Sequence, residues 1–210
     1  MAANDGRVHI WDKVTDTAPS KTLDDADEWI ECMSLSPNKE KLAVGSHDNS
    51  IYIYSTSDWS LLGKLSKHSS YIMALDWCAH GKFIRSNCGA YELLFFDVDT
   101  LSQDPSGASN LKNTAWATCT VKFGWHVQGI YPKGTDGTHV NRVNCNEDGT
   151  YLISGDDWCL LRIFNNPCLM GHRPRSYRGH SEFVTNCVFA GNKIFSVGGY
   201  DQTLMQWKSK

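Results

Sequence analysis

The residues in this sequence that are most capable of chemistry are a pair of adjacent carboxylates and two histidines around one turn. Asp156 and Asp157 are neighbours in a polar turn, and His126 and His139 flank a segment that contains Asp136. Groups of these types can act as general acids and bases. The sequence offers them no partner motif, because it contains no GxxxxGK[ST], GxSxG or HExxH pattern. We therefore predict that the protein is not an enzyme and has no catalytic residues, cofactor or small-molecule substrate.

Eight cysteines raise the alternatives of disulfides or a metal site. They stand at positions 32, 78, 88, 119, 145, 159, 168 and 187, and no two form a CxxC pair. Most of them fall within apolar stretches, where a free thiol behaves as a small core residue. The pattern predicts buried, reduced thiols and no metal, as is typical of a reducing compartment.

Charge and hydropathy exclude two further classes of partner. Lys and Arg total 20 and Asp and Glu total 23, so the formal net charge is −3. Such a balance disfavours binding to nucleic acid through bulk charge. Arg173, Arg175 and Arg178 form a small basic patch that is better explained as a solvated outer strand. The sequence has no long apolar run and no secretory signal, which predicts a cytoplasmic protein without a membrane anchor.

An internal repeat indicates the elements that position these residues. Apolar strands that end in an aromatic residue recur, with intervals of 43, 42, 68 and 43 residues between the endings Trp11, Tyr54, Phe96, Phe164 and Trp207. Two shorter strands, separated by polar turns such as SPNKEK and NEDGT, precede each of the last four endings. About four short strands per period of roughly 42 residues is typical of a β-propeller blade. We predict an all-β, WD-repeat β-propeller.

The repeat also predicts the domain organisation. About four full blades and a partial one are expected, as an incomplete or C-terminal portion of a larger propeller protein, with a compact five-unit ring as the alternative. The expected ranges are a partial blade at 1–23, a blade at 24–66, a blade with a loop at 67–115, connecting strands and a blade at 116–178, and a last blade without its outer strand at 179–210.

The last repeat carries the clearest structural motif. His180, Ser196, Asp201 and Trp207 resemble the tetrad of WD repeats, in which a serine hydroxyl links an aspartate-bound histidine to an indole N–H. Such a chain would satisfy every buried polar group that it contains. The second repeat keeps His68 and Ser86 but has other residues at the remaining two positions. We expect apolar packing between sheets to hold the repeats that lack the full tetrad.

The long interval between the second and third repeats contains an insertion. Its first part, TLSQDPSGASNLKNT, predicts an exposed loop. Its second part contains Trp116, Val121, Phe123, Val127 and Ile130, which are apolar enough to predict ordered strands. A long connection between blades and a hairpin that recognises a partner are both compatible with this pattern.

Several segments are more specific than a generic repeat. The segments HSSYIMALDW, VQGIYPKGTDGTHVN, SGDDWCLLRIFNNPC and GHSEFVTNCVF resemble the C-terminal propeller of the echinoderm microtubule-associated protein-like family. The similarity extends from about Asp5 to Trp207. This sequence departs from the family pattern at Ala90 and His139, each of which stands where the family usually has aspartate.

The resemblance implies a cytoskeletal scaffold that binds tubulin or microtubules. The alternatives are a propeller scaffold for another protein and a hydrolytic propeller. In a propeller, the loops before the innermost strand and between the second and third strands lie on one face. Exposed aromatic and charged residues there have the composition of a recognition surface. The expected partner-binding residues are Glu28, Trp29, His47, Asp48, Tyr71, Tyr91, Asp156, Asp157, Trp158, Phe183 and Tyr200.

Overall fold

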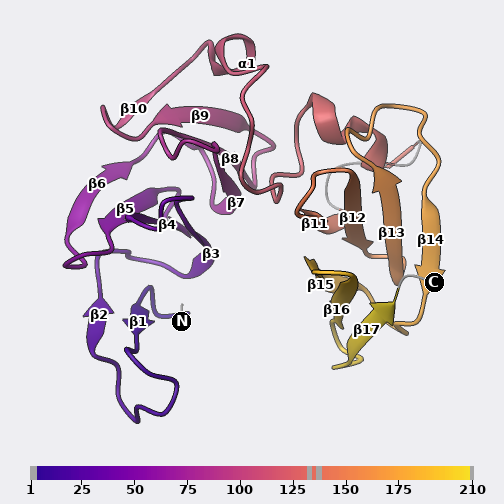
Figure 1. The fold of residues 1–210 in the computed structure, drawn as a ribbon, viewed down its shortest axis with the longest axis horizontal. Helices are drawn as coiled ribbons and strands as arrows, with labels where there is room; N and C mark the ends of the chain where they lie inside the picture. Colours follow the sequence, from indigo (N-terminus) through magenta and orange to yellow (C-terminus); the bar gives the residue numbers. More distant parts are fainter. Residues whose placement is uncertain (1–3, 132–133, 136–138, 209–210) are drawn as a thin grey trace. The chain divides into compact units, whose positions relative to one another are not determined.

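The computed structural model describes residues 4–131, 134–135 and 139–208, and these residues are mostly β-strands and turns (Figure 1). In the described parts of the chain, the strands form antiparallel sheets, and each sheet is built from strands that follow one another in the sequence. The chain divides into two compact units, Met1–Ala117 and Thr118–Lys210.

The first unit contains a two-stranded sheet, β1-β2, and two four-stranded sheets, β3-β4-β5-β6 and β7-β8-β9-β10. Its strands are β1 (Val8–Ile10), β2 (Lys21–Leu23), β3 (Ile30–Leu35), β4 (Lys41–Ser46), β5 (Ile51–Ser55), β6 (Leu61–Leu65), β7 (Ile72–Trp77), β8 (Phe83–Cys88), β9 (Leu93–Asp97) and β10 (Ser102–Gln103).

The second unit contains the four-stranded sheet β11-β12-β13-β14 and the three-stranded sheet β15-β16-β17. Its strands are β11 (Val140–Cys145), β12 (Tyr151–Asp156), β13 (Leu160–Asn165), β14 (Arg175–Arg178), β15 (Val184–Ala190), β16 (Lys193–Gly198) and β17 (Leu204–Lys208). All four residues of β14 are exposed, as expected of a solvated outer strand that carries Arg175 and Arg178.

Tight turns connect the strands, and in two of them a residue type with a low cost in the left-handed region stands at a position of positive φ. Asn49 between β4 and β5 has a φ of 67°, and Gly149 between β11 and β12 has a φ of 68°. Asparagine and glycine tolerate this conformation better than other residues do. In the second of these turns, Asp148 accepts hydrogen bonds from the amide and the hydroxyl of Thr150.

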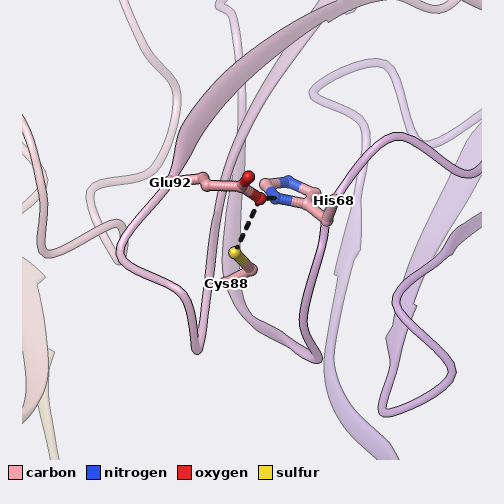
Figure 2. A group of neighbouring side chains, drawn as sticks. All are labelled: His68, Cys88 and Glu92. Atoms are coloured by element: carbon pink, nitrogen blue, oxygen red, sulfur yellow. Dashed lines mark hydrogen bonds and ion pairs between the residues drawn. The ribbon is translucent and has the colours of Figure 1, made fainter.

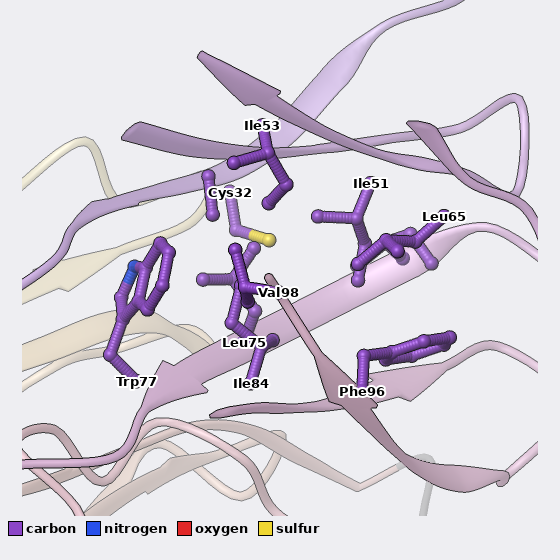
Figure 3. Close-up of a cluster of buried hydrophobic side chains, with 11 residues drawn as sticks. Cys32, Ile51, Ile53, Leu65, Leu75, Trp77, Ile84, Phe96 and Val98 are labelled. Atoms are coloured by element: carbon purple, nitrogen blue, oxygen red, sulfur yellow. The ribbon is translucent and has the colours of Figure 1, made fainter. Parts of the chain in front are cut away.

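The cores lie between neighbouring sheets. In the first unit, side chains such as Ile53 of β5, Trp77 of β7 and Phe96 of β9 form one buried cluster (Figure 3). Each large side chain buried in this way contributes about 1.5–3 kcal/mol to folding. The indole N–H of Trp77 also donates to the carbonyl oxygen of Ser34 at 3.0 Å, which links the two sheets. In the second unit, Ile153, Leu161 and Cys187 form a corresponding cluster.

The sheets stack in the manner of propeller blades. The first strands of neighbouring sheets pack against each other within each unit, β3 against β7 and β11 against β15. The predicted all-β propeller class is confirmed, with four blades that begin at β3, β7, β11 and β15. The short sheet β1-β2 precedes them. Each of the five predicted ranges contains one of these sheets.

The insertion differs from its prediction. The described residues between Trp116 and Tyr131 contain a 3₁₀ helix, η1 (Trp125–Ile130), and only an isolated bridge between Trp116 and Cys78. The prediction of strands there was therefore wrong. Val127 and Ile130 are three residues apart and both buried, and a spacing of three suits a 3₁₀ turn. The predicted exposed loop includes a short helix, α1 (Gly107–Asn110), and the turn at 133–138 lies partly outside the described residues.

The cysteines are free thiols, and six of the eight are buried. The prediction that most of the cysteines are core residues is confirmed. No helix of the described chain is long and apolar enough to cross a membrane.

Candidate partner-binding rim

One backbone contact recurs at the same end of all four blades. In each blade, the carbonyl oxygen of the residue before the first strand accepts a hydrogen bond. The donor is the backbone N–H of a residue in the turn between the second and third strands. The four pairs, carbonyl first, are Trp29 and His47 at 2.8 Å, Tyr71 and Gly89 at 2.9 Å, His139 and Asp157 at 3.0 Å, and Phe183 and Gly199 at 2.8 Å. We call these two loops of each blade the rim. Most of the predicted partner-binding residues lie on it.

In the first unit, the rim carries a run of three rings. The centroids of Trp29 and His47 are 5.2 Å apart, and His47 stacks on Tyr71 at 4.5 Å. Trp29 is 51% exposed and Tyr71 is 36% exposed. The rings come from two neighbouring blades, so the stack both joins the blades and leaves aromatic surface in contact with solvent.

A carboxylate that was not among the predicted site residues contacts the central ring of this stack. Oε2 of Glu31 lies 3.1 Å from Nε2 of His47. Glu31 is at a β-bulge, because the register of β3 and β4 shifts between Ile30 and Cys32. An extra residue of this kind changes the direction of a side chain. The sequence signal for this contact is an acidic residue two positions after Trp29.

The remaining predicted residues of the first unit differ in exposure. Tyr91 is 52% exposed in the turn between β8 and β9, and Glu28 is exposed beside Trp29. The side chain of Asp48 is only 9% exposed, and it accepts hydrogen bonds from the hydroxyl of Tyr52 and the amide of Ser50. Asp48 therefore supports its turn, and we correct its assignment as a contact residue. Burial, followed by the hydrogen bond to Asp48, raises the pKa of Tyr52.

In the third blade, an aromatic and polar group forms the rim. The rings of His139 and Trp158 are 4.8 Å apart, and Trp158 is 37% exposed. Oδ1 of Asp157 accepts from the side-chain amide of Asn141 at 2.8 Å. The same amide reaches the carbonyl oxygen of Val184 at 3.0 Å, which joins this blade to the next. Asn141 lies at the same bulge position as Glu31, and it too was missed.

The two adjacent aspartates do not share a site. Asp156 is 1% exposed and forms an ion pair with Arg162 at 3.0 Å, whereas Asp157 is partly exposed and bonded to Asn141. Burial raises the pKa of Asp156. Asp156 therefore belongs to the interior of its blade, and its assignment as a contact residue is corrected in the same way as that of Asp48.

The last blade presents one further aromatic pair. Phe183 and Tyr200 meet edge to face at 5.6 Å, and Tyr200 is 84% exposed. A Cβ on Gly199 would lie 2.3 Å from the ring of Phe183, so glycine is needed where this ring crosses the turn.

Below the rim of the last blade, hydrogen bonds join the four residues of the tetrad. Nδ1 of His180 is 3.0 Å from Asp201, and Nε2 is 2.7 Å from the hydroxyl of Ser196. The indole N–H of Trp207 donates to the same hydroxyl oxygen at 2.7 Å. One tautomer satisfies all of these contacts: His180 donates from Nδ1 to the carboxylate and accepts at Nε2 from Ser196.

The second blade builds a variant of this network with a residue that sequence reasoning missed. Nε2 of His68 is 2.7 Å from the hydroxyl of Ser86, and Nδ1 is 3.3 Å from Glu92. Glu92 thus supplies the carboxylate that Ala90 cannot, and it also accepts from the thiol of Cys88 (Figure 2). The departure at Ala90 is compensated two residues later. Hydrogen bonds, first from the amide of Ser69, lower the pKa of Glu92 to about 2.

His68, Cys88 and Glu92 are also residue types that bind metals. Their possible ligand atoms all lie within 4.8 Å of one another. Each side chain already has a partner in the tetrad-like network, and burial lowers the pKa of His68 and raises that of Cys88. The neutral states of both residues are therefore favoured, and the geometry is that of a structural hydrogen-bond network.

Comparison with known proteins gives the family. The model of the echinoderm microtubule-associated protein second β-propeller matches residues 1–209. The chain belongs to the echinoderm microtubule-associated protein family. This match confirms the resemblance that the repeat segments indicated.

Relatives agree with this family assignment. A ciliary WD repeat-containing protein, ctxp80, of Euplotoides octocarinatus is 52% identical over 99% of this chain and 29% of its own length. Human echinoderm microtubule-associated protein-like 1 is 38% identical over 97% of this chain and 26% of its own length. The chain therefore spans less than a third of the length of each of these relatives.

A solved structure supports the fold. A chain in the crystal structure of the mitotic checkpoint complex matches with a TM-score of 0.59 at 14% identity, over 99% of this chain and 57% of that one. At this identity, the likeness concerns the propeller architecture alone.

Proposed function

We propose that this chain is a non-catalytic scaffold of the cytoplasmic cytoskeleton that binds tubulin or microtubules through its rim. The observation that carries the proposal is the exposed aromatic stack of Trp29, His47 and Tyr71 in a chain of this family. Relatives at 36–40% identity bear names of microtubule-associated proteins, which supports a cytoskeletal partner. Aromatic side chains in such positions are common anchors of protein interfaces.

The charge of the chain defines how this binding would work. A net charge of −3 gives no general attraction to an acidic surface. Binding would therefore depend on shaped contacts from rim residues, with Trp29 and Tyr71 in the first unit and Trp158 in the second.

The test is co-sedimentation with microtubules, together with a size-exclusion shift with soluble tubulin. The variant Trp29→Ala/Tyr71→Ala/Trp158→Ala should reduce the bound fraction at least about tenfold, because truncation of an aromatic anchor costs 1–2 kcal/mol or more. The control is Tyr151→Ala, since Tyr151 is 48% exposed at the other end of β12 from the rim. Equal binding by the wild type, the triple variant and the control would remove the rim assignment.

A folded chain that binds no tubulin would favour the alternative, a propeller scaffold for another protein. The hydrolytic alternative has less support, because the carboxylates of Asp156 and Asp157 are committed to different partners. An enzymatic turnover that Asp157→Ala abolishes, with tubulin binding unchanged, would favour the hydrolytic alternative.

A further inference from the structure

The side chains on the rim of the first unit indicate what kind of partner it binds. This inference rests on the proposed role of the rim as a binding surface. Trp29, His47 and Tyr71 form a continuous run of rings whose two ends are exposed to solvent. Ring faces attract cations, and arginine stacks on them with a planar guanidinium group.

Acidic residues are concentrated in the sequence around Trp29. The segment from Asp24 to Glu31, DDADEWIE, contains five acidic residues and no basic one. Glu31 touches the central ring of the stack, with its carboxylate 3.1 Å from His47. The loop that carries Glu28 is fixed to the turn beside His47, because the hydroxyl of Ser46 donates to the carbonyl oxygen of Glu28 at 3.1 Å.

Part of this negative charge is not neutralised within the described chain. Asp24 pairs with Arg7 at 3.2 Å, and Asp48 lies 3.7 Å from the ammonium group of Lys64. Among the residues that the structure describes, Asp27 and Glu28 are exposed and take part in no ion pair. A cationic group that docks on the rings would therefore meet carboxylates that still lack a positive partner.

The other blades do not repeat the carboxylate at the bulge position. The bulge position of Glu31 is occupied by Met73, Asn141 and Thr185 in the second, third and fourth blades. Of these four side chains, only Glu31 carries a negative charge that can form an ion pair with a cation. A carboxylate at the bulge position is therefore local to the first blade, whereas in the third blade the carboxylate beside the ring pair is that of Asp157, 3.6 Å from Nδ1 of His139.

We propose that the rim at Trp29, His47 and Tyr71 binds an arginine-containing basic segment of a protein partner. The guanidinium group stacks on the exposed rings and donates to the carboxylates of Glu28 and Glu31. Charge complementarity selects a basic segment over an acidic one, and the planar stack selects arginine over lysine.

The test uses isothermal titration calorimetry of the chain at low ionic strength, with three short peptides in which glycine alternates with arginine, lysine or glutamate. The arginine peptide should bind most tightly and lose affinity as salt is added, because exposed charges are screened. Glu28→Gln/Glu31→Gln should weaken its binding about tenfold, and Trp29→Ala should weaken it severalfold.

The matched control is Glu40→Gln/Glu147→Gln, which changes the net charge equally at two exposed glutamates in the turns between the first and second strands, at the other end of their blades from the rim. This variant should bind the arginine peptide as the wild type does. An equal loss of affinity in both double variants would show diffuse electrostatics and overturn the proposal. The absence of a preference for arginine over glutamate would overturn it as well.

Tubulin binding by the same variants separates this inference from the proposed function. If Trp29→Ala weakens tubulin binding but the arginine peptide does not bind, the scaffold proposal stands and the basic-segment proposal is wrong. If the arginine peptide binds and tubulin does not, the basic-segment proposal stands and the tubulin proposal is wrong.

Discussion

Ser196 is the residue at which the hydrogen-bond network of the last blade branches. Its buried hydroxyl bonds to His180 and to Trp207, so one oxygen satisfies two polar groups. Ser86 holds the same place in the second blade, but Phe96 replaces the tryptophan there, so within the described residues the hydroxyl of Ser86 bonds only to His68.

This difference gives a first prediction. Ser196→Ala should lower the free energy of unfolding by about 2–3 kcal/mol and Ser86→Ala by about 1–2 kcal/mol, because a buried polar group that loses its partner costs about 1–3 kcal/mol. Urea unfolding measures both values, with the exposed Ser181→Ala as a control. A larger loss for Ser86→Ala than for Ser196→Ala would contradict the branched network.

Glu92 gives a second prediction at the residue scale, for the dependence of stability on pH. Its pKa falls from 4.5 to about 2 in the folded state. A carboxyl group with a depressed folded pKa contributes stability above its unfolded pKa and loses it as pH falls toward the folded pKa. Stability should therefore decline between about pH 4.5 and 2, and Glu92→Gln should flatten this decline. Unfolding measured at several pH values tests it, with Glu147→Gln as the control. An unchanged acid profile in Glu92→Gln would count against this role.

At the scale of the elements, the sheets pack closely because small residues stand where their faces meet. A Cβ on Gly45 of β4 would lie 2.7 Å from Sγ of Cys32 and 2.7 Å from a methyl group of Ile72 in the neighbouring blade. Gly155 of β12 stands in the same relation to Val184, at 2.6 Å. Both glycines lie at the same register position of the second strand.

We therefore expect Gly45→Ala to destabilise the chain by about 1–3 kcal/mol, since an added methyl group in a packed interior forces its neighbours to move. Gln206→Ala, at an exposed position of β17, is the matched strand control and should change little. Thermal and urea unfolding measure the difference. A stabilising effect of Gly45→Ala, through the lower entropy of the unfolded chain, would show that the blades have room to separate.

At the scale of the whole molecule, burial protects most of the thiols. Cys145 and Cys159 are partly exposed and the other six cysteines are buried. Burial raises the pKa of Cys187 to about 12 and that of Cys168 to about 11, which disfavours the reactive thiolate.

A thiol reagent should therefore modify about two cysteines rapidly in the native chain and all eight after unfolding. The unfolding midpoint should be the same with and without a reductant. Mass spectrometry of the labelled peptides identifies the sites, and rapid labelling of Cys88 or Cys187 would contradict the packing of these blades.

The order of the residues alone was enough to predict the all-β class, the repeat of short strands and the four members of the tetrad. These features are local, because alternation, turn residues and fixed spacing within one repeat are visible in the order of the residues. The same local view assigned Asp48 and Asp156 to the surface, although both side chains are turned inward and already bonded.

Which residues meet between loops and between blades depends on the tertiary fold. Glu31 reaches His47 because a bulge redirects it, His47 stacks on Tyr71 of the next blade, and Glu92 replaces a carboxylate that its turn lacks. Each of these contacts depends on the direction of a side chain across a sheet or between sheets. Residue spacing along the chain carries no such information, since it is packing that sets these directions.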